Sequence, residues 1–198
     1  MIAYTKPLAY SSPYGWVFWA VFLFTYLPEY RLIARSKPSP GEKTDRGSMA
    51  WVMLTGSLGS LAAFVVAPWS RFTILAHRTA WFALGLGILL AGSLLRRYCF
   101  RTLGPYFTGN VRVQAQQPVI DYGPYCLVRH PSYTGGMLMY LGTGLALTKW
   151  LSAFIFVAAG ALMYSYRVYV EEQALASSLG QPYLDYTRRT KRFIPFVF

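Results

Sequence analysis

The feature that most constrains this chain is a set of five long stretches without Lys, Arg, Asp or Glu. They cover residues 7–28, 47–70, 79–95, 131–148 and 150–166, with lengths of 22, 24, 17, 18 and 17 residues. A helix rises about 1.5 Å per residue, so roughly 17 to 25 apolar residues cross the hydrocarbon core of a bilayer. One such stretch also fits a buried helix of a soluble protein, but five do not. We therefore predict an all-α integral membrane bundle of about five transmembrane helices.

The basic residues predict how this bundle is oriented. The chain has 19 Lys and Arg against 7 Asp and Glu, a formal charge of +12, which in a soluble protein would suggest nucleic-acid binding. Fifteen of these cations follow the first, third and fifth stretches, and four lie on the opposite side. The positive-inside rule then places the C-terminus in the cytosol and the N-terminus outside. We expect the bilayer as partner, with its anionic lipids facing these cations, and no nucleic acid.

The chain is expected to form a single domain. Within residues 1–198, three spans occupy 1–100, and a loop, a helical hairpin and a tail occupy 101–198. The polar segment 36–48, with its prolines and glycine, is the one clear linker. The two cysteines lack any metal-ligand spacing, so we expect reduced thiols and no metal site.

Two pairs of small residues predict close helix packing. Gly56 with Ser60, and Gly87 with Ala91, have the spacing of four that lets membrane helices approach one another. We expect both pairs to lie at contacts between helices.

The fourth and fifth stretches are joined by little more than residues 148–150, which predicts a tight antiparallel hairpin. Both open ends of the hairpin would face the cytosol. This geometry would bring His130, just before the fourth stretch, close to Arg167 and Glu171, just after the fifth.

Charged side chains at the start of this hairpin suggest an anion site. Pro131 fits the first turn of a helix, where its missing N–H is not needed, so the positive end of the helix dipole would point to the cytosolic boundary. Arg129 and His130 lie at the same end, and together they suggest a site for a carboxylate or phosphate. Arg129 fits equally well as a cation that reaches the interface.

The end of the fifth stretch supplies a second group of charges. Arg167 and Glu171 are four residues apart, hence on one helix face, and both lie where an ionised group needs a partner. They could pair with each other. Alternatively, the guanidinium could bind a substrate carboxylate in a bidentate manner while the carboxylate faces a cationic cofactor. Glu172 lies about 100° further around the helix and is expected to be solvated.

The remaining residues predict a tail that folds back under the bundle. Gly180 would end the helix, and Tyr183, Tyr186 and Phe193 would then pack against the bundle. The four cations of this tail, which would face headgroups or solvent, are Arg188, Arg189, Lys191 and Arg192.

Three motifs in this half of the chain together resemble a known family. They are the run GPYCLVRHPSYTGG at 123–136, the pair EE at 171–172, and the pattern G-x-x-Y-x-x-Y-x-x-x-T-x-R-x-x-P at 180–195. In this order around a helical hairpin they resemble the isoprenylcysteine carboxyl methyltransferases and related membrane enzymes, including phospholipid N-methyltransferases. The resemblance covers about the last ninety residues.

The resemblance implies an S-adenosyl-L-methionine cofactor that enters from the cytosol and a lipophilic, prenylated substrate that enters from the bilayer. It implies catalytic roles for Arg167 and Glu171, with Arg167 binding the substrate carboxylate. The cofactor contacts that it implies are Gln117, Pro118, Val119, Ile120, Tyr125, His130, Pro131, Ser132, Tyr133 and Glu171.

Methyl transfer fits these residues, and other functions stay open. The reaction is an in-line displacement, so the protein must chiefly align the reacting atoms and exclude water. A carboxylate acceptor needs no general base, whereas the amine of a phospholipid would need one, with Glu171 or Glu172 as candidates. A sterol reductase using NADPH shares an HP-x-Y segment with this chain, and a non-catalytic membrane protein would use these charges for topology alone. No glycine-rich nucleotide-binding loop is visible in the sequence.

Overall fold

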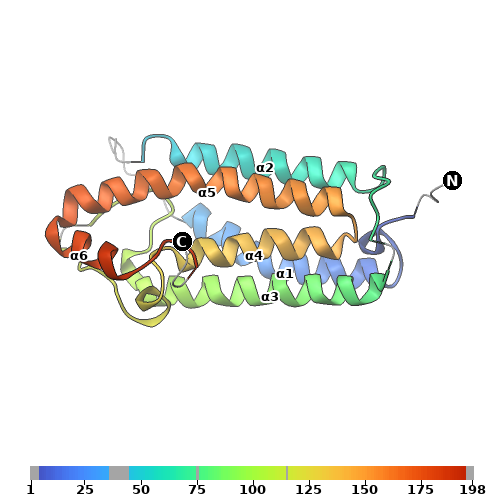
Figure 1. Cartoon of the computed structure of the whole chain (residues 1–198), viewed down its shortest axis with the longest axis horizontal. Coiled ribbons are helices and arrows are strands. Elements are labelled where there is room, and N and C mark those ends of the chain that lie inside the picture. The colour runs from blue at the N-terminus through green and yellow to red at the C-terminus, as the bar shows by residue number, and fades with distance from the viewer. Residues whose placement is uncertain (1–4, 36–44, 75, 115, 195–198) are drawn as a thin grey trace.

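The computed structural model describes residues 5–35, 45–74, 76–114 and 116–194, and every regular element in these ranges is a helix (Figure 1). The elements are η1 (Leu8–Tyr10), α1 (Tyr14–Arg35), α2 (Ser48–Val66), α3 (Arg78–Leu103), η2 (Gly104–Tyr106), η3 (Gly123–Cys126), α4 (Pro131–Ala146), α5 (Trp150–Leu179) and α6 (Gln181–Arg189). The predicted linker 36–48 lies mostly outside the described residues.

Each predicted stretch corresponds to one of the five long helices, so the all-helical prediction is confirmed. The ends differ: α1 continues past Glu29 to Arg35, and α5 continues past residue 166 to Leu179. Among the described residues, α2, the segment Arg78–Tyr106 and α5 are long and apolar enough to cross a membrane. That α1 and the 16-residue α4 also cross it stays a prediction.

The long helices lie side by side along one axis (Figure 1). Helix α3 packs against α4, α4 against α5, α5 against α2, and α1 against α3. Because α4 ends at Ala146 and α5 begins at Trp150, the predicted tight hairpin is confirmed. Helix α5 is nearly twice as long as α4 and extends beyond its start, toward the end of the bundle where α6 lies.

Glycines seven residues apart bring α3 and α4 into backbone contact. Gly85 and Gly92 on α3 face Gly135 and Gly142 on α4. A Cβ atom added to Gly142 would lie 2.4 Å from the backbone nitrogen of Leu89, closer than real Cβ atoms approach. This contact fixes the position of α4 along α3. It thereby also fixes the position of the candidate site residues at the start of α4.

Of the two predicted small-residue contacts, one is confirmed and one is wrong. A Cβ on Gly56 would lie 2.9 Å from the hydroxyl of Tyr140, so this glycine does face another helix. A Cβ on Gly87 would meet nothing within 4 Å. The face of α3 that packs against α4 is the one that carries Gly85 and Gly92. Along the chain, these two glycines lie before and after the predicted pair.

A buried lysine holds the closed end of the hairpin. Lys149 is fully buried, and its Nζ donates to the carbonyl oxygen of Ser70 and to the hydroxyl of Thr73, both at 2.7 Å. Backbone hydrogen bonds of Ile74 and Trp150 join the same two segments. From the sequence, Lys149 is one of the cations of the outer side. In the structure, its side chain ties the α2–α3 connection to the hairpin.

Candidate functional site

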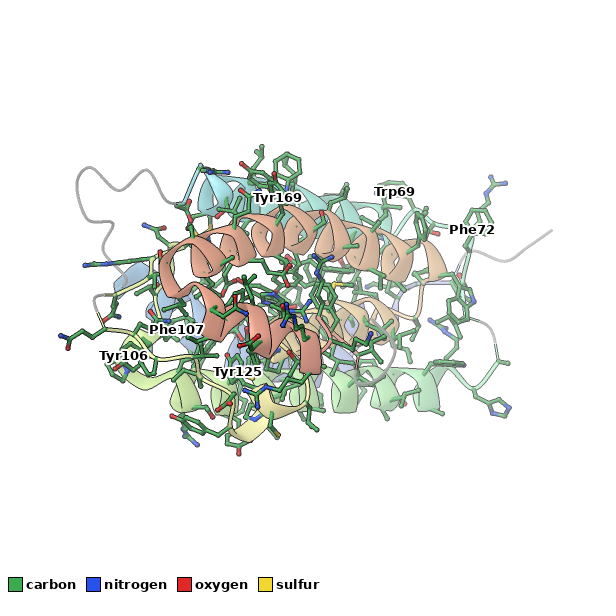
Figure 2. All side chains as sticks on the ribbon, turned by 60° about the vertical axis from the view of Figure 1, so that its left-hand side comes forward. Trp69, Phe72, Tyr106, Phe107, Tyr125 and Tyr169 are labelled. Atoms are coloured by element: carbon green, nitrogen blue, oxygen red, sulfur yellow. The ribbon has the colours of Figure 1, made fainter. Side chains whose placement is uncertain are left out.

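A cavity lies at the end of the bundle opposite the hairpin turn. It is bounded by α3, the start of α4, the second half of α5, the loop before η3, and α6, and encloses about 1250 Å³, including the part open to solvent. Figure 2 shows Tyr106, Phe107 and Tyr125 at this end, and Trp69 and Phe72 at the other. Ligand sites in proteins are typically concave and lined by apolar side chains with a few polar groups.

Most of the residues that the sequence singled out line this cavity. They are Gln117, Pro118, Val119, Ile120, Tyr125, His130, Ser132, Tyr133, Arg167 and Glu171. The exception is Pro131, which is buried in the first turn of α4 and does not line it. Their roles toward a cofactor or substrate stay a prediction.

His130 lies at the start of α4 and faces the acidic end of α5. Its side chain is buried, with Nδ1 4.0 Å from Oε2 of Glu171 and Nε2 3.2 Å from Oε1 of Glu172. The ring also stacks on that of Tyr133, with centroids 5.4 Å apart. The prediction that the hairpin brings His130 to Glu171 is therefore confirmed.

Tyr133 connects Arg167 and Glu171, the two residues for which the family resemblance implies catalytic roles. Its hydroxyl donates to Oε2 of Glu171 at 2.5 Å and accepts from Nε of Arg167 at 3.3 Å. Arg167 and Glu171 thus meet through a phenol and not through a direct ion pair. The bridge places a carboxylate, a hydroxyl and a guanidinium in one row along the cavity wall.

Arg167 binds two other segments of the chain as well. Its Nη1 donates to Oδ1 of Asp45 and to Oγ of Ser48, both at 2.7 Å, and its Nη2 donates to the carbonyl oxygen of Gly109 at 2.5 Å. These partners could not be predicted from the sequence because they lie near the start of α2 and in the loop after α3, far from α5 along the chain. Their effect is to fix the plane of the guanidinium.

Asp45 is held ionised by its surroundings. Burial alone would raise the pKa of its carboxyl group, but hydrogen bonds from the backbone amides of Met49 and Val111 and from the hydroxyl of Ser48, with the charge of Arg167, lower this pKa below its ordinary value. The Met49 amide that donates to this carboxylate lies in the first turn of α2, where a nearby negative charge is favourable. Asp45 therefore joins α2, the loop after α3 and α5.

A second guanidinium lines the cavity from α3. Arg96 donates from Nε to Oε1 of Glu29 at 2.6 Å, and from Nη1 to the carbonyl oxygen of Ser132 and to the hydroxyl of Tyr164. Both members of the Arg96–Glu29 ion pair are nearly buried. From the sequence, Arg96 is expected to be a cation of the third loop. The feature of the sequence that could have indicated this ion pair is Glu29, the one acidic residue of α1. An acidic residue within a membrane helix needs a partner.

Glu172 is not solvated, so that prediction is wrong. Its side chain is 16% exposed and accepts from Nε of Arg129 at 3.0 Å and from Nη2 of Arg192 at 2.8 Å, in addition to the contact with His130. Arg129 also donates to the carbonyl oxygens of Thr187 and Thr190. Arg129 therefore ties the tail to α5, and the prediction that it reaches the interface as a free cation is wrong.

The tail folds back and closes one side of the cavity, as predicted. Tyr183 and Tyr186 on α6 are buried and line the cavity, and burial raises the pKa of both phenols. The hydroxyl of Tyr186 donates to the carbonyl oxygen of Tyr125 at 2.7 Å. Arg188 and Arg189 are exposed as predicted, whereas Arg192 forms an ion pair with α5.

The cavity combines a polar wall with an apolar one. The polar wall consists of the row described above, His130 and the start of α4. The apolar wall consists of the side chains of Met49, Val52, Phe100, Leu103, Phe107, Leu175 and Leu179. Such a cavity suits a polar molecule and a lipophilic one side by side. In the described ranges, no group of three or more His, Cys, Asp and Glu has the geometry of a metal site.

Fold and site together define a helical membrane protein with a polar cavity at one end of its bundle. Comparison with known proteins shows which family this chain resembles. The model of the isoprenylcysteine carboxyl methyltransferase family matches residues 83–177, which include most of α3, the loop before α4, the hairpin and the two glutamates. Through this segment the chain resembles that family, and the resemblance drawn from its sequence motifs is confirmed.

Curated relatives carry the corresponding name. The chain is 30% identical over 115 residues to protein-S-isoprenylcysteine O-methyltransferase B of Arabidopsis thaliana, covering 57% of this chain and 58% of that protein. It is 31% identical over 116 residues to the Tribolium castaneum enzyme, covering 58% of this chain and 41% of that protein. With the Xenopus laevis enzyme the alignment reaches 196 residues at 29% identity, 94% of this chain and 65% of that protein. The chain thus leaves a third or more of each relative unmatched.

A solved structure shows the same fold. The eukaryotic intramembrane Ras methyltransferase superimposes with a TM-score of 0.71 at 22% identity, over 96% of this chain and 70% of that one. The predictions of an all-α membrane fold and of a multi-pass integral membrane protein are thereby confirmed.

Proposed function

We propose that the chain is an S-adenosyl-L-methionine-dependent methyltransferase of the membrane that methylates the carboxylate of a lipophilic substrate such as a C-terminal prenylcysteine. The observation that carries this proposal is the cavity in which Arg167, Tyr133 and Glu171 form a polar row opposite apolar side chains of α2 and α3. The names of the relatives support the same chemistry. In this proposal the cavity faces the cytosol and the N-terminus lies outside.

The residues around the cavity fit the methyl donor. The Glu171 carboxylate can face the positive sulfonium, and the start of α4 can receive the carboxylate of the donor. The phenol hydroxyl of Tyr183, a residue that lines the cavity, is buried without a hydrogen-bond partner among the described residues. Unpaired buried donors of this kind are rare, and a polar ligand in the cavity can supply the missing partner. The donor supplies an electrophilic methyl group, and the protein aligns and shields it.

Two arginines can orient the substrate carboxylate. Of the five N–H groups of Arg167, four donate to described residues, which leaves one on Nη2. Arg96 uses Nε and Nη1, and its Nη2 has no partner among the described residues. We assign the substrate carboxylate to Arg167, as the sequence motifs imply, with Arg96 as a second donor. An ionised carboxylate attacks without a base, so orientation and exclusion of water are the protein's main contributions.

The proposal is tested with the purified protein in detergent. Calorimetric titration should show saturable binding of S-adenosyl-L-methionine, and labelled methyl should appear on a farnesylated cysteine derivative. Cysteine without the prenyl group and the farnesylated methyl ester are the matched controls, and neither should accept label. A folded protein that binds no methyl donor would refute the proposal.

An amine-methylating enzyme is the second candidate. Glu171 is the carboxylate that lines the cavity, and it could take the proton that an amine must lose before attack. Label on phosphatidylethanolamine, with none on the prenylcysteine, would favour this candidate. Displacement of the methyl donor by NADPH would instead favour a reductase.

A further inference from the structure

The segment after α6 runs along the start of α4 and is bonded to it. We call residues 190–194 the C-terminal strap. The backbone amide of Arg129 donates to the carbonyl oxygen of Lys191 at 2.7 Å, and that of His130 to the carbonyl oxygen of Arg192 at 2.9 Å. The hydroxyl of Thr134 donates to the carbonyl oxygen of Phe193 at 2.9 Å. The strap therefore holds the residues that lead into α4 in one position.

Glu172 joins this strap to α5. Its carboxylate contacts three groups from two other segments: Arg129 and His130 ahead of α4, and Arg192 on the strap. Arg192 reaches both carboxylate oxygens, with Nε 3.1 Å and Nη2 2.8 Å from Oε2 and Nε 3.3 Å from Oε1. Because the carboxylate is nearly buried and charge-assisted bonds are stronger than neutral ones, this is a strong connection for a chain end.

The two neighbouring glutamates face different surroundings. Glu171 lines the cavity, whereas Glu172 does not. The groups that Glu172 holds, Arg129 and His130, do line it, together with Tyr183 and Tyr186 of α6. Any contribution of Glu172 to ligand binding must therefore pass through this wall.

We propose that Glu172 is a positioning residue that fastens the C-terminal strap to α5 and thereby sets the affinity of the cavity for the methyl donor. The inference rests on the proposed function for the identity of the ligand. Glu172 touches neither donor nor substrate in this account. Without its charge, the strap separates more readily from the start of α4, and the wall formed by Arg129 and His130 loses its fixed place.

The test compares Glu172→Gln, Glu172→Asp and Arg192→Gln with the control Arg188→Gln. Arg188 belongs to the same tail but is 76% exposed and pairs only with Asp185 among the described residues. For Glu172→Gln we expect the Kd for S-adenosyl-L-methionine to rise about tenfold, equivalent to about 1.4 kcal/mol, while kcat at saturating donor stays within about twofold. Arg192→Gln should shift the Kd in the same direction by less, and Glu172→Asp should restore part of the affinity.

A second readout needs no activity. Chymotrypsin, whose aromatic cleavage sites none of these variants removes, should cleave the tail faster in Glu172→Gln and Arg192→Gln than in the wild type, and the donor should slow this cleavage. The double variant Glu172→Gln with Arg192→Gln should show the same Kd and the same cleavage rate as Glu172→Gln alone. Both changes remove the same contact, that between Glu172 and Arg192. The control should match the wild type in both assays.

The outcomes separate this inference from the function on which it rests. A folded Glu172→Gln protein with wild-type Kd and wild-type cleavage would overturn the inference, as would a loss of kcat with unchanged donor Kd. If Glu172→Gln does not fold, Arg192→Gln decides, because Arg192 is 46% exposed and its loss leaves the buried contacts of Glu172 in place. A wild-type protein that binds no donor would refute the proposed function, and the cleavage assay would still decide whether Glu172 fastens the strap.

Discussion

Replacing Arg167 by lysine removes the planar guanidinium while keeping the positive charge. In the structure its three nitrogens donate to four groups in different directions: Asp45, Ser48, the carbonyl of Gly109 and the hydroxyl of Tyr133. A lysine has a single nitrogen, and we expect it to stay with Asp45 and Ser48. The bonds to Gly109 and Tyr133 are then lost. At about 1.5 kcal/mol for each hydrogen bond from a charged group, the two losses amount to about 3 kcal/mol, or roughly 10²-fold.

Methyl transfer to a farnesylated cysteine and thermal unfolding should be measured on the same Arg167→Lys preparation. We expect a folded protein whose turnover falls about 10²-fold, because Tyr133 and the substrate carboxylate lose their orientation. Arg97→Lys is the matched control: Arg97 also lies in the second half of a long helix and donates to a carbonyl, that of Phe24, but it does not line the cavity. Its turnover should stay within about twofold of the wild type. Near-normal turnover by Arg167→Lys would show that methyl transfer does not need the guanidinium geometry of Arg167.

Three further predictions concern stability, each read from thermal unfolding in detergent. Gly142→Ala should destabilise the bundle by about 1 to 3 kcal/mol because its Cβ would overlap the backbone of α3, whereas Gly87→Ala, with open space around it, should be neutral or slightly stabilising; equal effects would contradict the packing. Because the pKa of Asp45 is lowered in the folded protein, its stabilisation is full above the ordinary carboxyl pKa and is lost as the pH falls through the lowered value. Asp45→Asn should therefore reduce stability at neutral pH and flatten the acid side of the profile, and an unchanged profile would exclude this role. Glu29→Gln should cost about 3 to 5 kcal/mol by leaving Arg96 unpaired, and Glu29→Gln with Arg96→Met should recover much of it; no recovery would show that the ion pair does not act as a unit.

The positions of the long helices could be predicted because the absence of charge is a property of the sequence itself. The same holds for the hairpin: a connection as short as 148–150 leaves no alternative to antiparallel neighbours. From the hairpin follows the approach of His130 to Glu171, which the structure shows at 4.0 Å. These conclusions needed only helix geometry and short connections.

Contacts that depend on how helices rotate and pack could not be predicted. The sequence offers several small-residue faces on α3, and only the partner helix decides that Gly85 and Gly92 face it and Gly87 does not. Glu172 was expected to be solvated because its neighbour Glu171 was placed in the site, but the tail returns to cover it. Its partner Arg192 could not be foreseen from helix period alone.

The partners of the two buried arginines were missed for the same reason. Asp45 and Glu29 lie 122 and 67 residues from Arg167 and Arg96, and no local pattern connects them. A general rule was nonetheless available: an ionised residue within a membrane helix needs an opposite charge. Applied to Glu29 and Arg96, it would have predicted that each has a partner, though not which one.

The most direct test of the account is a structure of the protein with the product of the methyl donor, S-adenosyl-L-homocysteine, bound. We predict the ligand in the cavity between α4, α5 and α6, with its polar end near His130 and Glu171 and its sulfur turned toward Arg167. A ligand bound elsewhere on the folded protein, with this cavity left to another molecule, would contradict the assignment of the cavity to the methyl donor.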